Sequence, residues 1–266
     1  MAKLDGNIIF TGSLGNITAF KRRDLNETIL RQKQGIDGMR VKTDPAFKNT
    51  RLNNTEFGGC AKAGSRIRKA LSGLTRLTDF NISSRFNGIC KSLQCMDLVN
   101  DWGQRSVLFS KEGKVLEGFS LTGRSPFNEV VTSPIHYNIS RKLLSANIAI
   151  PKLVPGINFF IPAKKPFYRF VIVLGILPDL IYRSKDGYGV ANSTGAIEIK
   201  AIETQWFIAE EILETQALEI TLNRQPALQD SESLMLSIGL EPGEPGPGGE
   251  LIWAKYTGCA QILAIK

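Results

Sequence analysis

The feature of the sequence that most restricts its fold is a change in hydrophobic periodicity near residue 106. Between residues 43 and 100, apolar side chains recur every three or four positions, which is typical of amphipathic helices. From residue 106 onward, short segments alternate apolar and polar positions between Pro, Gly, Asn and Asp turn signals, which is typical of antiparallel strands. The sequence therefore predicts an α+β protein, in which an N-terminal β-hairpin and two helices are followed by a mostly antiparallel β-sandwich.

Two helices are predicted in the first of these regions. Thr43 or Asp44 can cap a helix that has Pro45 at its first position. This segment is either one helix or two helices broken at the glycine pair 58–59. A second helix is predicted over residues 79–100, with the aspartate at its start as the cap.

The N-terminal hairpin is predicted from two strand-like runs, 17–21 and 28–32, that flank a polar segment. We therefore expect a hairpin arm, a basic helical segment and a β-sandwich domain, at residues 1–40, 41–104 and 105–266 respectively.

Three segments of the β-rich region carry more specific expectations. Residues 106–121 alternate around Glu112 and Gly113 and predict a strand, a turn and a strand. Residues 203–218 allow a helix as the main alternative to strands. Residues 239–250 are rich in Pro and Gly, which cannot continue a β-ladder, so an exposed loop is expected there.

Charge is distributed unevenly along this chain of net charge +8. Residues 1–90 hold 16 Lys and Arg against 7 Asp and Glu, residues 91–200 hold 14 against 8, and residues 201–266 hold 3 against 10, so these segments carry +9, +6 and −7. A basic front can bind nucleic acid or the acidic end of another copy of the chain. Contact between the two ends within one monomer is the remaining alternative.

The reactive groups that most enzymes need are sparse in this sequence. His136 is the only histidine, and no Gly-x-Ser-x-Gly or phosphate-binding glycine motif occurs. Cys60, Cys90, Cys95 and Cys259 lack the spacing of a zinc site and are too few for a disulfide framework, so free thiols are expected. We expect no enzymatic activity, no cofactor and no metal.

Three stretches of the chain resemble an uncharacterised family of conserved bacterial proteins: "GSLGNITAFKRRDLNETILRQKQG", "DPAFKNTRLNNTEFGGCAKAGSRIRKAL" and "YTGCAQILAIK". In that family a glycine-turn hairpin precedes a Pro-x-Phe-x-x-Thr-Arg-x-Asn helix and a β-rich remainder. The resemblance covers mainly the first 75 residues. It implies this architecture and no known activity.

The sequence start lacks the basic and apolar regions of a signal peptide. The longest apolar run, at 170–177, is far shorter than the roughly 20 residues of a spanning helix. We expect synthesis in the cytoplasm and no membrane span, with release as part of an assembly left open.

These observations favour a non-enzymatic structural subunit that assembles with itself head to tail into a filament, tube or other oligomer. The alternatives are a nucleic-acid-binding protein that uses the basic N-terminal half, and a glycan-binding or hydrolytic β-sandwich that uses Trp206, Trp253 or Tyr256. For assembly, basic side chains of one copy are expected to face acidic side chains of the next. The basic set is Lys21, Arg22, Arg23, Arg31 and Lys33, and the acidic set is Glu210, Glu211, Glu214 and Glu219.

Overall fold

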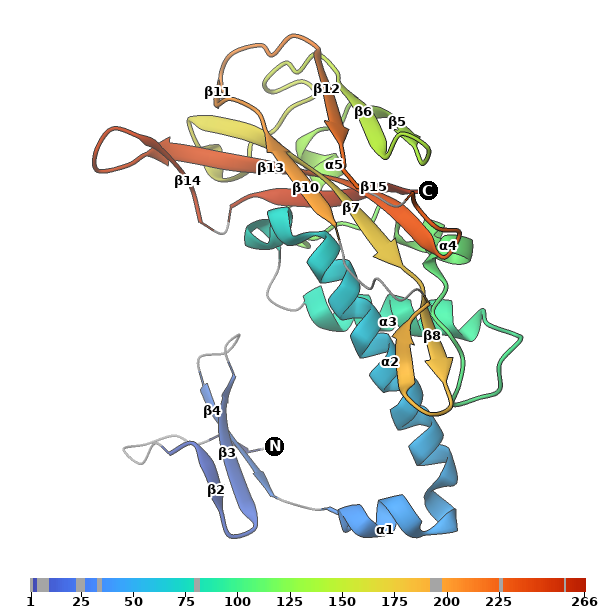
Figure 1. Cartoon of the computed structure of the whole chain (residues 1–266). Coiled ribbons are helices and arrows are strands. Elements are labelled where there is room, and N and C mark those ends of the chain that lie inside the picture. Colours follow the sequence, from blue (N-terminus) through green and yellow to red (C-terminus); the bar gives the residue numbers. More distant parts are fainter. Residues whose placement is uncertain are drawn as a thin grey trace. The chain divides into compact units, whose positions relative to one another are not determined.

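The computed structural model describes residues 2–3, 10–22, 27–32, 35–78, 82–191, 198–224, 227–255 and 257–266. The chain divides into two compact units, Met1–Asn53 and Asn54–Lys266. The predicted α+β class is confirmed, since strands, then helices, then a mostly antiparallel β-rich part follow one another along the chain (Figure 1).

The first unit holds a small antiparallel sheet with the strand order β1-β4-β3-β2. Its strands are β1 (Ala2–Lys3), β2 (Gly12–Leu14), β3 (Ile17–Arg22) and β4 (Glu27–Gln32), so the predicted hairpin is present as β3 and β4. Helix α1 (Gly38–Thr43) and the 3₁₀ turn η1 (Pro45–Phe47) follow. Asp44 caps η1 as predicted, because its carboxylate accepts the N–H of Ala46 at 2.9 Å.

Helix α2 (Lys48–Ala70) is continuous through its glycine pair. Gly59 faces the ring of Tyr188, and a Cβ at Gly59 would lie 2.7 Å from that ring. This glycine therefore serves close packing and does not break the helix. The 3₁₀ turn η2 (Ser72–Leu77) comes next.

Helix α3 (Ile82–Cys95) is shorter than the predicted 79–100 segment, whose proposed cap Asp79 lies outside the described residues. The helix ends early because Asp97 turns the chain. Its side chain accepts the N–H groups of Val99 and Asn100, at 3.0 and 3.2 Å, and thereby competes with helical pairing.

Two large sheets and a two-stranded hairpin lie in the described second half of the chain. The larger has the order β10-β7-β13-β14, with β11 also on β7 and β15 also on β13, and the smaller has the order β12-β6-β5. Every pairing in both sheets is antiparallel. The strands are β5 (His136–Ser140), β6 (Ser145–Ile150), β7 (Phe167–Pro178), β10 (Ile199–Glu203), β11 (Phe207–Ile208), β12 (Gln216–Thr221), β13 (Glu232–Pro245), β14 (Leu251–Trp253) and β15 (Cys259–Ile265). The hairpin of β8 (Leu180–Arg183) and β9 (Gly187–Val190) follows β7, and the short 3₁₀ turn η4 (Pro162–Lys164) precedes β7.

The long strand β7 is buried on both faces. Side chains alternate across a strand, so Phe170 and Ile172 pack in one core with the smaller sheet, whereas Val171 and Val173 pack in a second core with α2, η2 and α3. The larger sheet is thus the middle layer, with the smaller sheet on one face and the helices on the other (Figure 1).

The prediction of a strand, a turn and a strand at 106–121 is wrong. Helix α4 (Phe109–Glu112) and the 3₁₀ turn η3 (Gly113–Leu116) lie there, and α5 (Phe127–Val130) follows. Tertiary contacts override the alternation: Ser110 donates its N–H and its hydroxyl to Asp179, at 2.8 and 2.5 Å. Gly113 packs so closely on Ile265 that a Cβ would lie 2.7 Å from its Cγ2.

The late strands differ from two features considered in the sequence, a helix at 203–218 and a loop at 239–250. The alternative helix at 203–218 is not formed, because β10 ends at Glu203 and β11 and β12 follow. The exposed loop expected at 239–250 is wrong in its first half, since β13 continues to Pro245. Pro242 fits the ladder because its carbonyl accepts the N–H of Ala254 at 2.8 Å.

Candidate functional site

Three of the basic residues proposed for assembly lie on the hairpin of β3 and β4. Lys21 and Arg22 are on β3, and Arg31 is on β4. Cross-strand partners share a face, and Arg31 pairs with Thr18 while Lys21 pairs with Thr28. Lys21 and Arg31 therefore project from opposite faces of the sheet. The other two proposed residues, Arg23 and Lys33, lie outside the described residues.

The same small sheet exposes apolar side chains. Leu14 pairs with Ile17 on the face that carries Lys21, and their exposed fractions are 69% and 40%. Phe20 is exposed on the other face, together with Arg31. Within the described part of this unit, the buried side chains are those of Ala19 and Ile29. We call the face with Leu14, Ile17 and Lys21 the basic–apolar face.

Three of the four proposed acidic residues lie in one segment of the second unit. Glu210, Glu211 and Glu214 are exposed between β11 and β12. Glu214 forms an ion pair of 2.7 Å with Lys152 of the same chain, so Glu210 and Glu211 supply the net negative charge.

Large apolar residues are exposed in the same segment and in the turn that follows Leu153. Leu213 and Leu153 exchange backbone hydrogen bonds of 2.8 and 3.0 Å, which joins the segment between β11 and β12 to the start of the 153–160 turn. Four large apolar side chains of these two segments are exposed: Ile157, Phe160, Ile208 and Ile212. We call these four residues, with Glu210 and Glu211, the acidic–apolar patch.

The sequence does not identify the apolar part of this patch. In an extended chain Ile212 and Leu213 point to opposite faces, and the pairing of Leu213 with Leu153, far away in the sequence, decides which of the two is buried. The one local signal is the Pro155-Gly156 turn, which is followed directly by the exposed Ile157.

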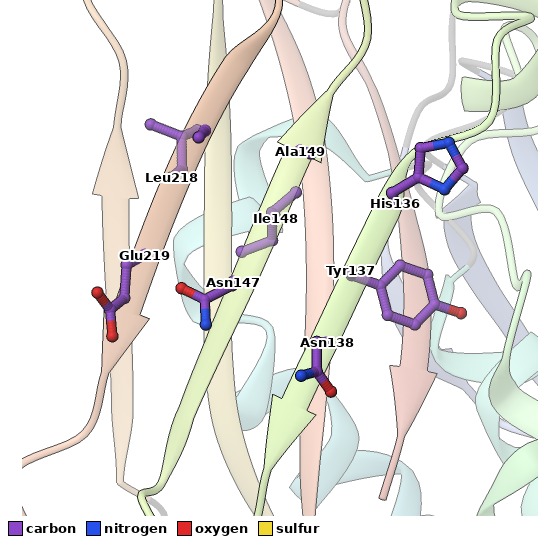
Figure 2. Close-up of a pocket in the computed structure, with 9 residues that line it drawn as sticks. His136, Tyr137, Asn138, Asn147, Ile148, Ala149, Leu218 and Glu219 are labelled. Atoms are coloured by element: carbon purple, nitrogen blue, oxygen red, sulfur yellow. The ribbon is translucent and has the colours of Figure 1, made fainter.

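Glu219 lies apart, in a shallow depression of about 550 Å³ on the smaller sheet. Figure 2 shows Glu219, Asn147 and Asn138 on three neighbouring strands, with His136 near one end of the depression. His136 is exposed. The lining offers hydrogen-bonding groups from two amides, one carboxylate, an imidazole and a phenol, and it includes no Ser, Thr or Cys.

Three of the four cysteines, Cys60, Cys90 and Cys259, are buried and have the character of structural thiols. Burial raises the pKa of Cys60 to about 11 and raises the pKa values of Cys90 and Cys259 further, so these thiols are protonated at neutral pH. All four cysteines are free. In the described ranges, no three His, Cys, Asp or Glu side chains cluster as a metal site.

The tryptophans proposed for glycan binding are both partly buried. The guanidinium of Arg169 lies 4.5 Å from the ring centroid of Trp206. Trp253 lies on β14 and pairs with Gly243 of β13. Tyr256, the third candidate, lies outside the described residues.

Comparison with known proteins gives no relative: no family model, curated protein or solved structure matches the chain. Among the described residues, no helix has the length and apolar character needed to cross a membrane.

Proposed function

We propose that the chain is a non-enzymatic structural subunit that assembles with copies of itself through head-to-tail contacts. The observation that carries the proposal is the small N-terminal sheet, whose described residues bury Ala19 and Ile29 while leaving Leu14, Ile17 and Phe20 exposed. Small sheets need a packed apolar face for stability. A partner that covers this sheet would supply that packing.

The exposed apolar side chains of this sheet supply part of the energy that association needs. Full burial of one aliphatic side chain is worth about 1.5–3 kcal/mol, and several such side chains are needed to exceed the entropic cost of association. Opposite charge on the two partners adds orientation and speeds the encounter. Leu14 and Ile17 supply part of the apolar area, and Lys21 supplies charge on the same face.

The signs of the charges favour contact between unlike surfaces over contact between two basic faces. The first 90 residues carry +9 and the last 66 carry −7. A two-fold contact between basic faces would bring like charges together, whereas contact between unlike surfaces would not. Unlike surfaces that do not close into a ring produce a filament or tube.

The test is the mass of the full-length protein as a function of concentration, measured by sedimentation velocity and electron microscopy at low and high salt. We expect mass to rise with concentration, and to rise less at high salt because screening weakens the charge attraction. A full-length Leu14→Ser/Ile17→Thr variant should assemble poorly. Leu143→Ser is the matched control, since Leu143 is equally exposed, at 68%, on the turn between β5 and β6.

A monodisperse monomer at every concentration would contradict the proposal. Gel shifts with single- and double-stranded DNA and RNA separate it from the nucleic-acid alternative. A steeply salt-dependent complex without self-assembly would favour that alternative. Several cations of the basic half already have partners within the chain, including Lys62, Arg68, Arg76 and Arg105.

A further inference from the structure

We propose that the acidic–apolar patch is the surface that receives the basic–apolar face of a neighbouring copy. The inference rests on the proposed function and adds its second surface. Glu219, although acidic, is not part of this surface, because it lies in the separate depression on β12 (Figure 2).

The two surfaces are complementary because both expose apolar side chains and their charges are of opposite sign. The basic–apolar face presents Leu14 and Ile17 next to Lys21. The acidic–apolar patch combines four exposed apolar side chains with the exposed Glu210 and Glu211, on two segments joined by the bridge between Leu153 and Leu213. Exposed apolar groups rimmed by charge are typical of protein interaction sites, and the opposite signs select this pairing over contact between two identical surfaces.

The turn that carries Ile157 is held in place by its own hydrogen bonds. The Asn158 side chain accepts the N–H of Val154 at 2.7 Å and donates to the carbonyl of Lys152 at 2.9 Å and the hydroxyl of Ser133 at 2.8 Å. A surface that is already ordered loses little conformational entropy on binding. The patch is therefore suited to receive a partner without rearrangement.

The ion pair between Glu214 and Lys152 also shapes the specificity. It neutralises one carboxylate at the edge of the patch. Glu210 and Glu211 thus become the residues that select a cation, and Lys21 is the cation that accompanies the apolar pair on the incoming face.

The experiment uses two full-length variants that each lose one surface. The face variant is Leu14→Ser/Ile17→Thr and the patch variant is Ile157→Ser/Ile212→Ser; all four positions are exposed, so both variants are expected to fold, which circular dichroism checks. Each variant alone should associate at least about tenfold more weakly than the wild type, because each loses two apolar contacts. An equimolar mixture should form dimers and stop there, since the face variant keeps its patch and the patch variant keeps its face.

Charge reversal tests the polar component separately. Lys21→Glu alone and Glu211→Lys alone should each weaken assembly at low salt, and the double variant should recover it. Leu143→Ser should assemble like the wild type.

The outcomes separate this inference from the proposed function. A wild-type protein that never assembles would overturn both. A wild-type protein that assembles, with a patch variant that assembles equally well or a mixture that contains no dimer, would overturn the inference and leave the proposed function standing. The same conclusion would follow if the double charge reversal failed to recover assembly.

Discussion

The substitution Glu56→Gln tests how the second unit is held together. Glu56 lies on α2 and is fully buried. Its carboxylate accepts the N–H of Gly103 at 2.9 Å and two N–H groups of Arg105, both at 2.7 Å, and it also pairs with Lys91. This one carboxylate therefore joins α2 to α3 and to the loop that follows α3. Glutamine removes the charge while keeping the size of the side chain.

The magnitude follows from the pKa of Glu56. Burial raises the pKa of a carboxyl, but the hydrogen bonds from Arg105, Lys91 and Gly103 outweigh burial, and the pKa of Glu56 is lowered from 4.5 to about 2. A lowering of that size corresponds to about 3 kcal/mol of folding stability at neutral pH. Breaking a buried ion pair at one partner costs about 3–5 kcal/mol, which agrees with this estimate.

The sign of the pH dependence is fixed by the direction of the shift. Because the pKa in the folded state is below its ordinary value, the contribution is fully present above about pH 5 and is lost as the pH falls toward 2. The wild type should therefore lose stability in this range faster than Glu56→Gln. The difference between the two proteins should shrink as the pH falls.

The assay is urea unfolding at pH 7 and at a series of lower pH values, followed by circular dichroism and by tryptophan fluorescence. Trp102 precedes Gly103 and so reports on the loop itself. Glu214→Gln is the control, since Glu214 and Lys152 are exposed by 73% and 52% and such pairs contribute at most about 1 kcal/mol. Equal stability of Glu56→Gln and wild type at pH 7, or a difference that does not change with pH, would refute the reasoning.

Two further substitutions probe packing and burial. Gly175→Ala should lower the melting temperature and cost about 1–3 kcal/mol of folding stability, because a Cβ would lie 2.8 Å from the carbonyl oxygen of Ala70. Gly58→Ala, on the exposed side of α2, is the control and should be neutral or stabilising by up to about 1 kcal/mol. Equal loss of stability at both sites would contradict this explanation. Burial raises the pKa of Asp179 despite the hydrogen bonds that its carboxylate accepts from Ser110. The contribution of Asp179 to folding stability therefore falls as the pH rises above 3.8, the ordinary pKa of this group. Asp179→Asn should accordingly be at least as stable as the wild type in urea at pH 7, with a smaller advantage at pH 4. A lower urea midpoint for Asp179→Asn at pH 7 would count against this explanation.

The fold class could be predicted from the sequence because periodicity is a local property. Helix α2 and strands β6, β7 and β12 all follow the patterns that the residues display. The prediction failed at 106–121, where packing of Gly113 against Ile265 and bonding of Ser110 to Asp179 decide the conformation. Both contacts join residues far apart in the sequence, and alternation alone carries no information about them.

The candidate surfaces could be predicted only in part, and for a related reason. The charges of Lys21, Glu210 and Glu211 are visible in the sequence, whereas the exposure of Ile212 depends on which strand lies beside it. Glu56 illustrates the converse. A single glutamate within a basic helix is expected to be exposed to solvent. The burial of Glu56 depends on the hydrogen bonds that Gly103 and Arg105 donate to its carboxylate, and these residues are far from it in the sequence.

Charged and apolar contacts have different effects on association, and this difference predicts how the proposed assembly should respond to salt. Charges on the rim of an interface act mainly on the rate of encounter and are screened over about 10 Å at 0.1 M salt. In the proposed interface, Leu14, Ile17, Ile157 and Ile212 would act on the lifetime of the complex once it forms, because apolar burial is insensitive to such screening. Salt should therefore slow the growth of an assembly more than it dissolves one already formed, and dissolution should follow from loss of the apolar side chains.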